Sequence, residues 1–350
     1  MNIKTDEIFT LLDKFIEDCK IVSKKHPYIV VILMHEYFRN IWPNDPFIEQ
    51  KFSNDKLDSI ILCLKNCIQL LSLSKDLGSY IESSEIENSL KNFKINTDEG
   101  DTQIVYGELW KSLDEPYITN ETQNILKNIL EKGGISSEYL KNKNILDMGC
   151  GSGRFTIALA NMCAKKVTGI DLGSSGIKIG QETAKKSKLD NIEFIKNNVL
   201  SLPFDDESFD FVFSKGVLHH TGNLKQALNE YHRVMKKNGK GYLYLYGSGG
   251  IFWNSRKKMR EVMKNIPMDY TLSILKIIGM PNKRYIFVDS WYVPIEEHVK
   301  REWLENFLRE KFSSFIRIDE TGDPNIDSMT NSDYSKEIWG DGELRYLISK

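Results

Sequence analysis

The chain has 350 residues, more than a typical single domain, so we expect two domains or one large domain with additions. Its 47 basic and 49 acidic residues leave a formal net charge of −2, which argues against a nucleic-acid partner and favours a small, roughly neutral substrate. The five cysteines include no CxxC pair, which is typical of a reducing compartment rather than of a disulfide framework.

The N-terminus, MNIKTDEIFT, lacks a basic stretch followed by an apolar core, so no signal peptide is predicted. No apolar run in the sequence approaches the ~20 residues of a membrane span, and the longest covers residues 28–34. We therefore expect a cytoplasmic protein without a membrane partner.

Apolar residues recur at helical spacing through about residue 95, for example at Leu57, Ile60, Ile61 and Leu64. The polar stretch 96–100 then marks a boundary. We expect an N-terminal helical region over residues 1–100 and a second domain over residues 101–350. The helices are interpreted as a lid, as a homodimer contact or as both, although such apolar stripes most often only pack on the main domain.

Strands and helices alternate in the second domain. After a helix at 121–132, we predict strands at 145–148, 166–171, 192–196, 209–214 and 241–246, with helices at 154–164, 174–186 and 223–236 between them. A helix near 299–308 and strands at 315–318 and 344–348 close the domain. Repeated βαβ units of this kind predict an α/β fold with a doubly wound, mostly parallel, seven-stranded sheet.

Residues 247–296 interrupt the alternation with many aromatic and basic residues and no convincing strand. We interpret them as a helical cap inserted after strand five, close to the strand ends where such sheets bind ligands. Aromatic side chains there can enclose a substrate and an arginine can clamp a carboxylate or phosphate, but single aromatics more often form the core of their own segment. The candidate substrate residues are Trp253, Arg256, Trp291 and Tyr292, together with Tyr106, which precedes the first strand. From there Tyr106 either folds over the cofactor as a lid residue or packs against the N-terminal helices.

The most informative stretch is NILDMGCGSG at 144–153, in which a short strand leads through Gly149, Gly151 and Gly153 into a helix. Glycines at such a turn let the backbone approach a nucleotide-like ligand. The dinucleotide pattern GxGxxG would need glycine at Arg154, so GxGxG describes the loop better. Asp171 follows at the end of the second strand, where a carboxylate can accept both hydroxyls of a ribose.

Four ordered motifs, LDMGCGSGRF, VTGIDLG, LSLPFDDESFDFVFSKGVLHH and HRVMKKNGKGYLYLY, resemble those of class I S-adenosylmethionine-dependent methyltransferases. The likeness is greatest for the subgroup with an LPF to LHH signature, which includes small-molecule enzymes such as the ubiquinone and menaquinone C-methyltransferases. It covers roughly residues 140–250 and the closing helix and strands. The resemblance implies a Rossmann-like fold, S-adenosyl-L-methionine as cofactor and a transferase of the EC 2.1.1 class.

The resemblance also implies roles for single residues. A carboxylate and the glycines would surround the methionyl part of the cofactor, Asp171 would hold the ribose, and Asn198 stands where the family usually has an aspartate for the adenine. Lys215 departs from the small or amide residue common at its position, so it would bind a substrate or cofactor carboxylate or point to solvent. The implied cofactor-binding residues are Asp147, Gly149, Gly151, Gly153, Asp171, Asn198, Val199 and Ser214.

His219 and His220 stand where a general base would act on a hydroxyl or a carbon acid. The alternative is a helix start whose rings pack on the sheet. The remaining histidines show no metal-ligand spacing, so no metal site is predicted.

The leading hypothesis is a methyltransferase that acts on a small-molecule acceptor by in-line displacement. A nicotinamide-dependent reductase on a similar sheet is one alternative, and a catalytically silent nucleotide-binding assembly protein is another. The methylated atom, whether oxygen, nitrogen, sulfur or carbon, stays open.

Overall fold

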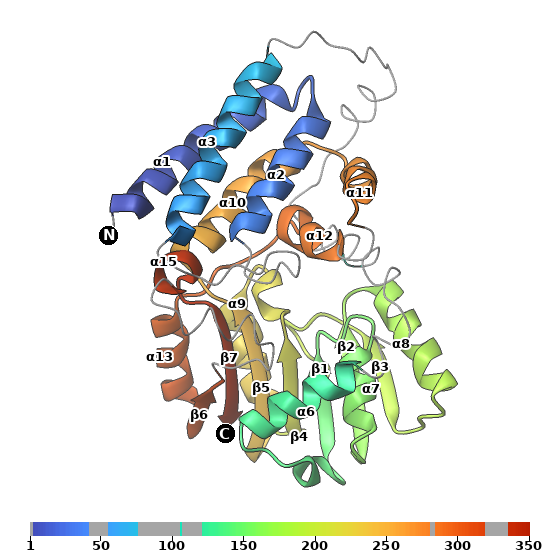
Figure 1. Ribbon diagram of the computed structural model, residues 1–350. Coiled ribbons are helices and arrows are strands. Elements are labelled where there is room, and N and C mark those ends of the chain that lie inside the picture. Colours follow the sequence, from blue (N-terminus) through green and yellow to red (C-terminus); the bar gives the residue numbers. More distant parts are fainter. Residues whose placement is uncertain (1–2, 42–54, 76–105, 107–120, 281–283, 319–334) are drawn as a thin grey trace. The chain divides into compact units, whose positions relative to one another are not determined.

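The computed structural model describes residues 3–41, 55–75, 106, 121–280, 284–318 and 335–350 (Figure 1). The chain forms two compact units, and each contains several separate chain segments. A helical unit comprises Met1–Asn96, Gly249–Val293 and Ser328–Gly340, and an α/β unit comprises Thr97–Ser248, Pro294–Asp327 and Asp341–Lys350. The predicted boundary near residue 100 lies outside the described residues, whereas most of the segment interpreted as a cap groups with the N-terminal helices.

Among the described residues, three N-terminal helices, three helices from the inserted segment and the short helix α15 build the helical unit (Figure 1). Helix α3 packs on α1 and α2, while α10 packs on α1, α2, α12 and α15. Their bounds are α1 Ile3–Val22, α2 Pro27–Ile41, α3 Asp55–Lys75, α10 Gly250–Met263, α11 Met268–Ile277, α12 Arg284–Tyr292 and α15 Ser335–Trp339. The buried rings of Phe38 and Trp291 lie 5.9 Å apart, and the hydroxyls of Tyr37 and Ser255 are 2.8 Å apart. The inserted segment thus completes the core of the N-terminal helices.

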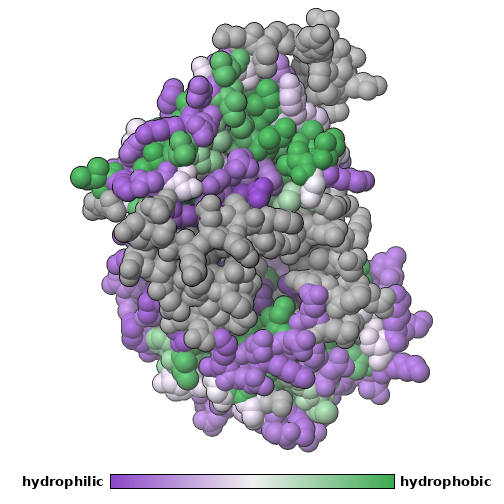
Figure 2. All heavy atoms as spheres, viewed as in Figure 1, coloured by the Kyte–Doolittle hydropathy of each residue, from purple (hydrophilic) through white to green (hydrophobic). Residues whose placement is uncertain are grey.

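Helix α3 is unusually apolar. Among the described residues, one stretch, Lys56–Lys75, is long and apolar enough to cross a membrane by length and composition alone. Such a stretch also arises in the core helix of a bundle, and the charged side chains of α3 make ion pairs with α1, namely Lys4 with Asp58 and Lys65 with Glu7. Apolar and polar residues are interspersed on the surface that Figure 2 shows.

The α/β unit is a seven-stranded sheet with the order β3-β2-β1-β4-β5-β7-β6. Strands β1 to β5 run parallel to one another, and β7 is antiparallel to both β5 and β6. The predicted doubly wound, mostly parallel sheet is therefore confirmed. The strands are β1 Asn144–Met148, β2 Lys166–Asp171, β3 Ile192–Lys196, β4 Phe209–Lys215, β5 Met235–Tyr246, β6 Ser314–Arg317 and β7 Glu343–Ser349. The helices are α6 Thr122–Lys132, η2 Ser137–Leu140, α7 Arg154–Ala160, α8 Ser174–Lys186, η3 Leu218–His220, α9 Leu224–Val234 and α13 Arg301–Lys311.

The largest differences from the expected bounds are in α7 and β5. Helix α7 ends at Ala160 rather than at residue 164, and Cys163 adopts a left-handed φ of 60°, which no helix accommodates. Strand β5 begins at Met235 rather than at residue 241, since Met235 pairs with Phe209 across an irregularity in the β4–β5 ladder. Both differences lie away from the strand ends at which the candidate site residues are found.

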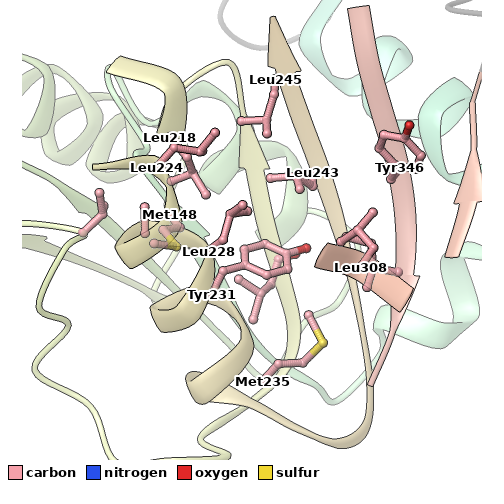
Figure 3. Packing of buried hydrophobic residues seen from close by; sticks show 14 of the residues in the cluster. Met148, Leu218, Leu224, Leu228, Tyr231, Met235, Leu243, Leu245, Leu308 and Tyr346 are labelled. Atoms are coloured by element: carbon pink, nitrogen blue, oxygen red, sulfur yellow. The ribbon is translucent and has the colours of Figure 1, made fainter. Parts of the chain in front are cut away.

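Apolar clusters cover both faces of the sheet. On one face, sheet residues such as Leu243 pack with Leu228 of α9 and Leu308 of α13, as Figure 3 shows. Tyr231 joins this core, and its hydroxyl donates a hydrogen bond of 3.0 Å to the Val212 carbonyl. On the other face, α6 and α7 pack over Phe213 and its neighbours. Burial of each large apolar side chain contributes about 1.5–3 kcal/mol, so the sheet holds its strand ends firmly in place.

Candidate cofactor and acceptor site

The glycine loop between β1 and α7 uses backbone conformations that favour glycine. Gly149, Gly151 and Gly153 have φ values of 87°, 53° and 76°. A Cβ on Gly149 would lie 2.3 Å from Val217 Cγ1, and one on Gly153 would lie 2.7 Å from the Phe194 ring. Both φ and close packing therefore require glycine at these two positions. The loop is tied down by the N–H groups of Gly149 and Cys150, which both donate to the Ile170 carbonyl at 2.8 and 2.9 Å.

Asp171 ends β2 and clamps this loop. Its Oδ2 accepts a hydrogen bond of 2.8 Å from the Gly151 N–H, and its Oδ1 accepts one of 2.7 Å from the Gly173 N–H. Burial raises the pKa of Asp171, and the two N–H groups oppose that rise because they stabilise the carboxylate. A carboxylate offers about four acceptor positions, so both oxygens retain capacity for a ligand's hydroxyls. Its predicted contact with a ribose stays a prediction.

Asp147 lies beneath the loop in β1 and is buried. Its Oδ2 accepts a hydrogen bond of 2.6 Å from the Thr156 hydroxyl of α7. Burial raises the pKa of Asp147 to about 7. The structure thus shows Asp147 linking β1 to α7, and its predicted contact with a methionyl group is untested.

The other candidate cofactor residues lie at neighbouring strand ends. Asn198 follows β3, and its Oδ1 accepts a hydrogen bond of 2.8 Å from the Leu200 N–H. Val199 is buried in the core beside it. Ser214 of β4 is fully buried, and its hydroxyl donates to the Met148 carbonyl at 2.9 Å, which joins the ends of β4 and β1. The contacts predicted for these three residues stay predictions.

The two adjacent histidines occupy different environments in η3. The His219 ring is fully buried, with its centroid 4.0 Å from that of Tyr246. His220 Nδ1 lies 2.6 Å from the Ile295 carbonyl oxygen, and because a carbonyl only accepts, Nδ1 carries the proton. In the neutral ring Nε2 is then an acceptor, and the Tyr106 hydroxyl lies 3.1 Å from it. Of the two candidate bases, His220 is therefore the one whose Nε2 is in position to accept a proton.

Lys215 ends β4 on the face covered by α7. Its Nζ lies 5.4 Å from the Phe155 ring centroid and 5.1 Å from that of Tyr244, and the side chain is partly buried. Burial, with the positive charges of Arg154 and Arg345, lowers the pKa of Lys215 to about 7. Lys215 therefore does not simply point to solvent.

The candidate substrate residues of the inserted segment lie together in the core of the helical unit. Trp253, Arg256, Trp291 and Tyr292 are each at most 2% exposed. Arg256 pairs with Asp289 at 3.1 Å, and the Tyr292 hydroxyl donates to the Ile266 carbonyl at 3.0 Å. These contacts are those of a packed core, and the substrate role of the four residues stays a prediction.

Sequence reasoning did not single out Arg154 or Arg345 as functional residues. Arg154 was noted only as the residue that breaks GxGxxG. Arg345 is a charged residue inside the otherwise apolar closing strand, between Leu344 and the apolar run 346–348. That charge is the sequence signal by which Arg345 could have been found. No described group of His, Cys, Asp and Glu side chains is arranged to hold a metal ion.

Comparisons with known proteins identify the kind of domain that contains the glycine loop. Residues 140–269 match a family model described as a methyltransferase domain. A demethylmenaquinone methyltransferase of Listeria welshimeri is 37% identical over 101 residues, which are 28% of this chain and 43% of the relative. A protein of the same name from Staphylococcus epidermidis is also 37% identical over 101 residues, which are 28% of this chain and 41% of that relative. The chain thus spans less than half the length of these curated relatives.

Solved structures were also compared. The YcgJ protein from Bacillus subtilis aligns with a TM-score of 0.44 and 14% identity, over 66% of this chain and 98% of that protein. An S-adenosylmethionine-dependent methyltransferase, described as putative, from Methanococcus maripaludis aligns with a TM-score of 0.41 and 20% identity, over 73% of this chain and 95% of that one. With the family match, the strand order and the glycine loop in place, the α/β unit contains a class I S-adenosylmethionine-dependent methyltransferase domain.

Proposed function

We propose that this chain is an enzyme that transfers a methyl group from S-adenosylmethionine to a small molecule. The observation that carries the proposal is the glycine loop: it has no room for a Cβ at Gly149 or Gly153, and Asp171 clamps it. A preformed backbone cradle with a carboxylate beside it fits a nucleoside that carries a methionyl group. The loop also lies within the residues that match the methyltransferase family.

When bound, S-adenosylmethionine supplies a methyl carbon that its sulfonium charge already activates. The residues that would hold it are the glycine loop for the methionyl part, Asp171 for the ribose, and Asn198 with Val199 for the adenine. Because the donor is already activated, the main task of the protein is to align the acceptor and exclude water.

A proton must leave when the acceptor atom is a hydroxyl oxygen or an acidic carbon. His220 Nε2 is the candidate to receive it, because the Ile295 carbonyl holds the proton on Nδ1 and thereby leaves an electron pair on Nε2. After transfer, the imidazolium keeps its Nδ1–H bond to Ile295. The Tyr106 hydroxyl, 3.1 Å from Nε2, marks the direction from which such a proton arrives.

Isothermal titration calorimetry with S-adenosylhomocysteine tests donor binding. We expect micromolar binding by the wild type, at least ~10-fold weaker binding by Asp171→Asn, and no change for Asp190→Ala, an exposed control two residues before β3. No binding by the wild type, or equal binding by Asp171→Asn, would refute the proposal.

An extract of metabolites incubated with a methyl-labelled donor then tests turnover. Labelled product supports a transferase, whereas donor binding without turnover on any acceptor favours the silent assembly alternative. Quinol-like compounds belong in this screen, because the matched relatives are named for methylation of demethylmenaquinone.

The near-neutral charge of the chain supports a small acceptor rather than a nucleic acid. The described cysteines are free thiols, which supports the proposed cytoplasmic location. A homodimer through the N-terminal helices is a separate proposal, which sedimentation of the full chain at several concentrations would test.

A further inference from the structure

The segment 198–206 follows β3 and begins beside Asp171. The N–H of Asn197 donates a hydrogen bond of 3.0 Å to the Asp171 carbonyl. Because Asp171 is proposed to hold the ribose, the first two residues of the segment, Asn198 and Val199, lie where the base of the same nucleoside would be bound. The shape of this segment is therefore relevant to the donor site.

Arg233 of α9 binds the segment with its whole guanidinium group. Its Nη1 donates to the Phe204 carbonyl at 2.7 Å and to the Asp206 carboxylate at 2.9 Å, and its Nη2 donates to the Leu202 carbonyl at 3.1 Å. Its Nε and Nη2 also donate to the two carboxylate oxygens of Glu230 at 2.7 and 2.8 Å. These five hydrogen bonds use the five N–H donors of a guanidinium group. Arg233 thus acts on the protein itself rather than on a ligand.

Two further side chains of α9 hold the same segment. The Oε2 atom of Glu230 accepts a hydrogen bond of 2.7 Å from the Leu202 N–H. Hydrogen bonding from Arg233 lowers the pKa of Glu230, which keeps this carboxylate charged. The exposed Gln226 donates from Nε2 to the Leu200 carbonyl at 3.2 Å. We call Gln226, Glu230 and Arg233 together the α9 clamp.

The α9 clamp is connected to the candidate adenine residues through the backbone of Leu200. The Leu200 N–H donates to Asn198 Oδ1 at 2.8 Å, while the carbonyl of the same residue is held by Gln226. Val199 and Leu202 are buried in one apolar cluster together with Leu228 of α9. A segment that is held in one shape before a ligand arrives loses less conformational entropy when the ligand binds.

We propose that Arg233 and Glu230 are positioning residues that hold Asn198 and Val199 in place for the adenine of the donor, a role that rests on the proposed transferase function. Both act through the backbone of residues 200–204. Loss of the α9 clamp leaves the hydrogen bond between Asp171 and Gly151 intact. It therefore weakens the hold on the base and spares the hold on the methionyl group.

The first experiment compares two ligands that share the adenine. S-Adenosylhomocysteine carries the methionyl-type carboxylate and amine, and 5′-methylthioadenosine lacks both. By calorimetry we expect Arg233→Met to weaken both ligands by the same factor of about tenfold. Arg233→Lys keeps the charge but not the five-donor geometry, so it should weaken both at least ~5-fold. Unchanged binding of both ligands, or a selective loss of S-adenosylhomocysteine, overturns the proposal.

A control on the same helix separates positioning from a general loss of stability. Tyr231 of α9 lies in the apolar core (Figure 3), and its hydroxyl bonds to the Val212 carbonyl rather than to the segment. Tyr231→Phe should lower the urea midpoint but bind both ligands within about twofold of the wild type. Equal weakening by Tyr231→Phe and Arg233→Met would contradict a positioning role.

A milder variant keeps the test decisive if Arg233→Met does not fold. Gln226→Ala removes an exposed side chain and its bond to the Leu200 carbonyl. Both ligands should then bind about threefold more weakly. Wild-type affinity in Gln226→Ala, with Arg233→Met unfolded, would leave the α9 clamp with a purely structural role and overturn the proposal.

Hydrogen exchange tests the α9 clamp without a ligand. The Leu202 amide, which bonds to Glu230, should exchange at least ~10-fold faster in Arg233→Met and at the wild-type rate in Tyr231→Phe. An unchanged rate in Arg233→Met would refute the positioning role. If the wild type binds neither ligand, the transferase proposal fails. If the wild type binds both and Arg233→Met binds them equally well, only the positioning role fails.

Discussion

The helical unit and the α/β unit both contain buried aromatic and charged side chains, but they use them differently. In the helical unit, Arg256 pairs with Asp289, Tyr292 donates a hydrogen bond to the Ile266 carbonyl, and both side chains are almost fully buried. In the α/β unit, Asp171 and Lys215 lie at strand ends and are only partly buried. By residue type alone, both pairs of residues are candidates for ligand binding. Only Asp171 and Lys215 lie at the carboxyl edge of the sheet, and that position distinguishes them from Arg256 and Tyr292.

The largest effect is expected in the glycine loop. Gly149→Val adds a side chain where Val217 already lies 2.3 Å from a Cβ, at a φ of 87°. Donor affinity should fall by at least ~1000-fold, measured by calorimetry. The control is Gly134→Ala, which has a φ of 70° but no atom within 4 Å of its Cβ, so it adds backbone strain without a clash. Equal loss of donor affinity in both variants would show that the clash is irrelevant.

The second effect tests whether Arg256 is structural. Arg256→Met leaves Asp289 without its 3.1 Å partner in a poorly exposed position, so the free energy of unfolding should fall by about 2–4 kcal/mol in urea titrations. Donor affinity should not change. Unchanged stability with a raised KM for the acceptor would instead support the substrate role predicted from the sequence.

The third effect concerns His220. His220→Gln removes the Nε2 base, and kcat should fall about 100-fold if the acceptor loses a proton in the reaction. The matched variant is Tyr106→Phe, which removes only the hydroxyl 3.1 Å away. A fall in kcat that vanishes at high pH would support the base, whereas unchanged kcat would indicate an acceptor such as an amine or thiolate that needs none.

The smallest effect is a pH dependence of stability. The pKa of Asp147 is raised from 3.8 to about 7, so the folded state holds a proton that the unfolded state has lost, and stability falls as pH rises between these values. The pKa of Lys215 is lowered from 10.5 to about 7, so stability rises again from pH 7 toward 10.5. Thermal or urea unfolding should show that Asp147→Asn flattens the acidic limb of the stability curve and that Lys215→Met flattens the alkaline limb. An unchanged limb would place that group's pKa near its ordinary value.

Local sequence patterns were sufficient to predict most strands and helices of the α/β unit. An apolar run is followed by a turn signal at three places: at the end of β1 before the glycine loop, at the acidic end of β2 and after β4. The order of these elements could therefore be predicted from the sequence alone. The glycines were assigned correctly to a turn because no other residue tolerates such φ values.

Contacts between residues far apart in the sequence could not be predicted from local patterns. Tyr106 and His220 are 114 residues apart, and Arg345 meets Tyr244 only because an antiparallel strand closes the sheet beside β5. Likewise, no local signal showed that Trp291 would complete the core around Phe38. Pairings of this kind depend on the assembled fold, so the sequence indicated the donor side better than the acceptor side.

The discontinuous helical unit also constrains how the chain folds during synthesis. Helices α1 to α3 leave the ribosome well before α10 and α12, although Tyr37 and Phe38 bury their rings against residues of those later helices. At ~5–20 residues per second, the wait from residue 41 to residue 291 is about 10–50 s. During that time the apolar faces of α1 to α3 lack their final cover, which makes the nascent helical segment a natural client for chaperones that hold exposed apolar surface.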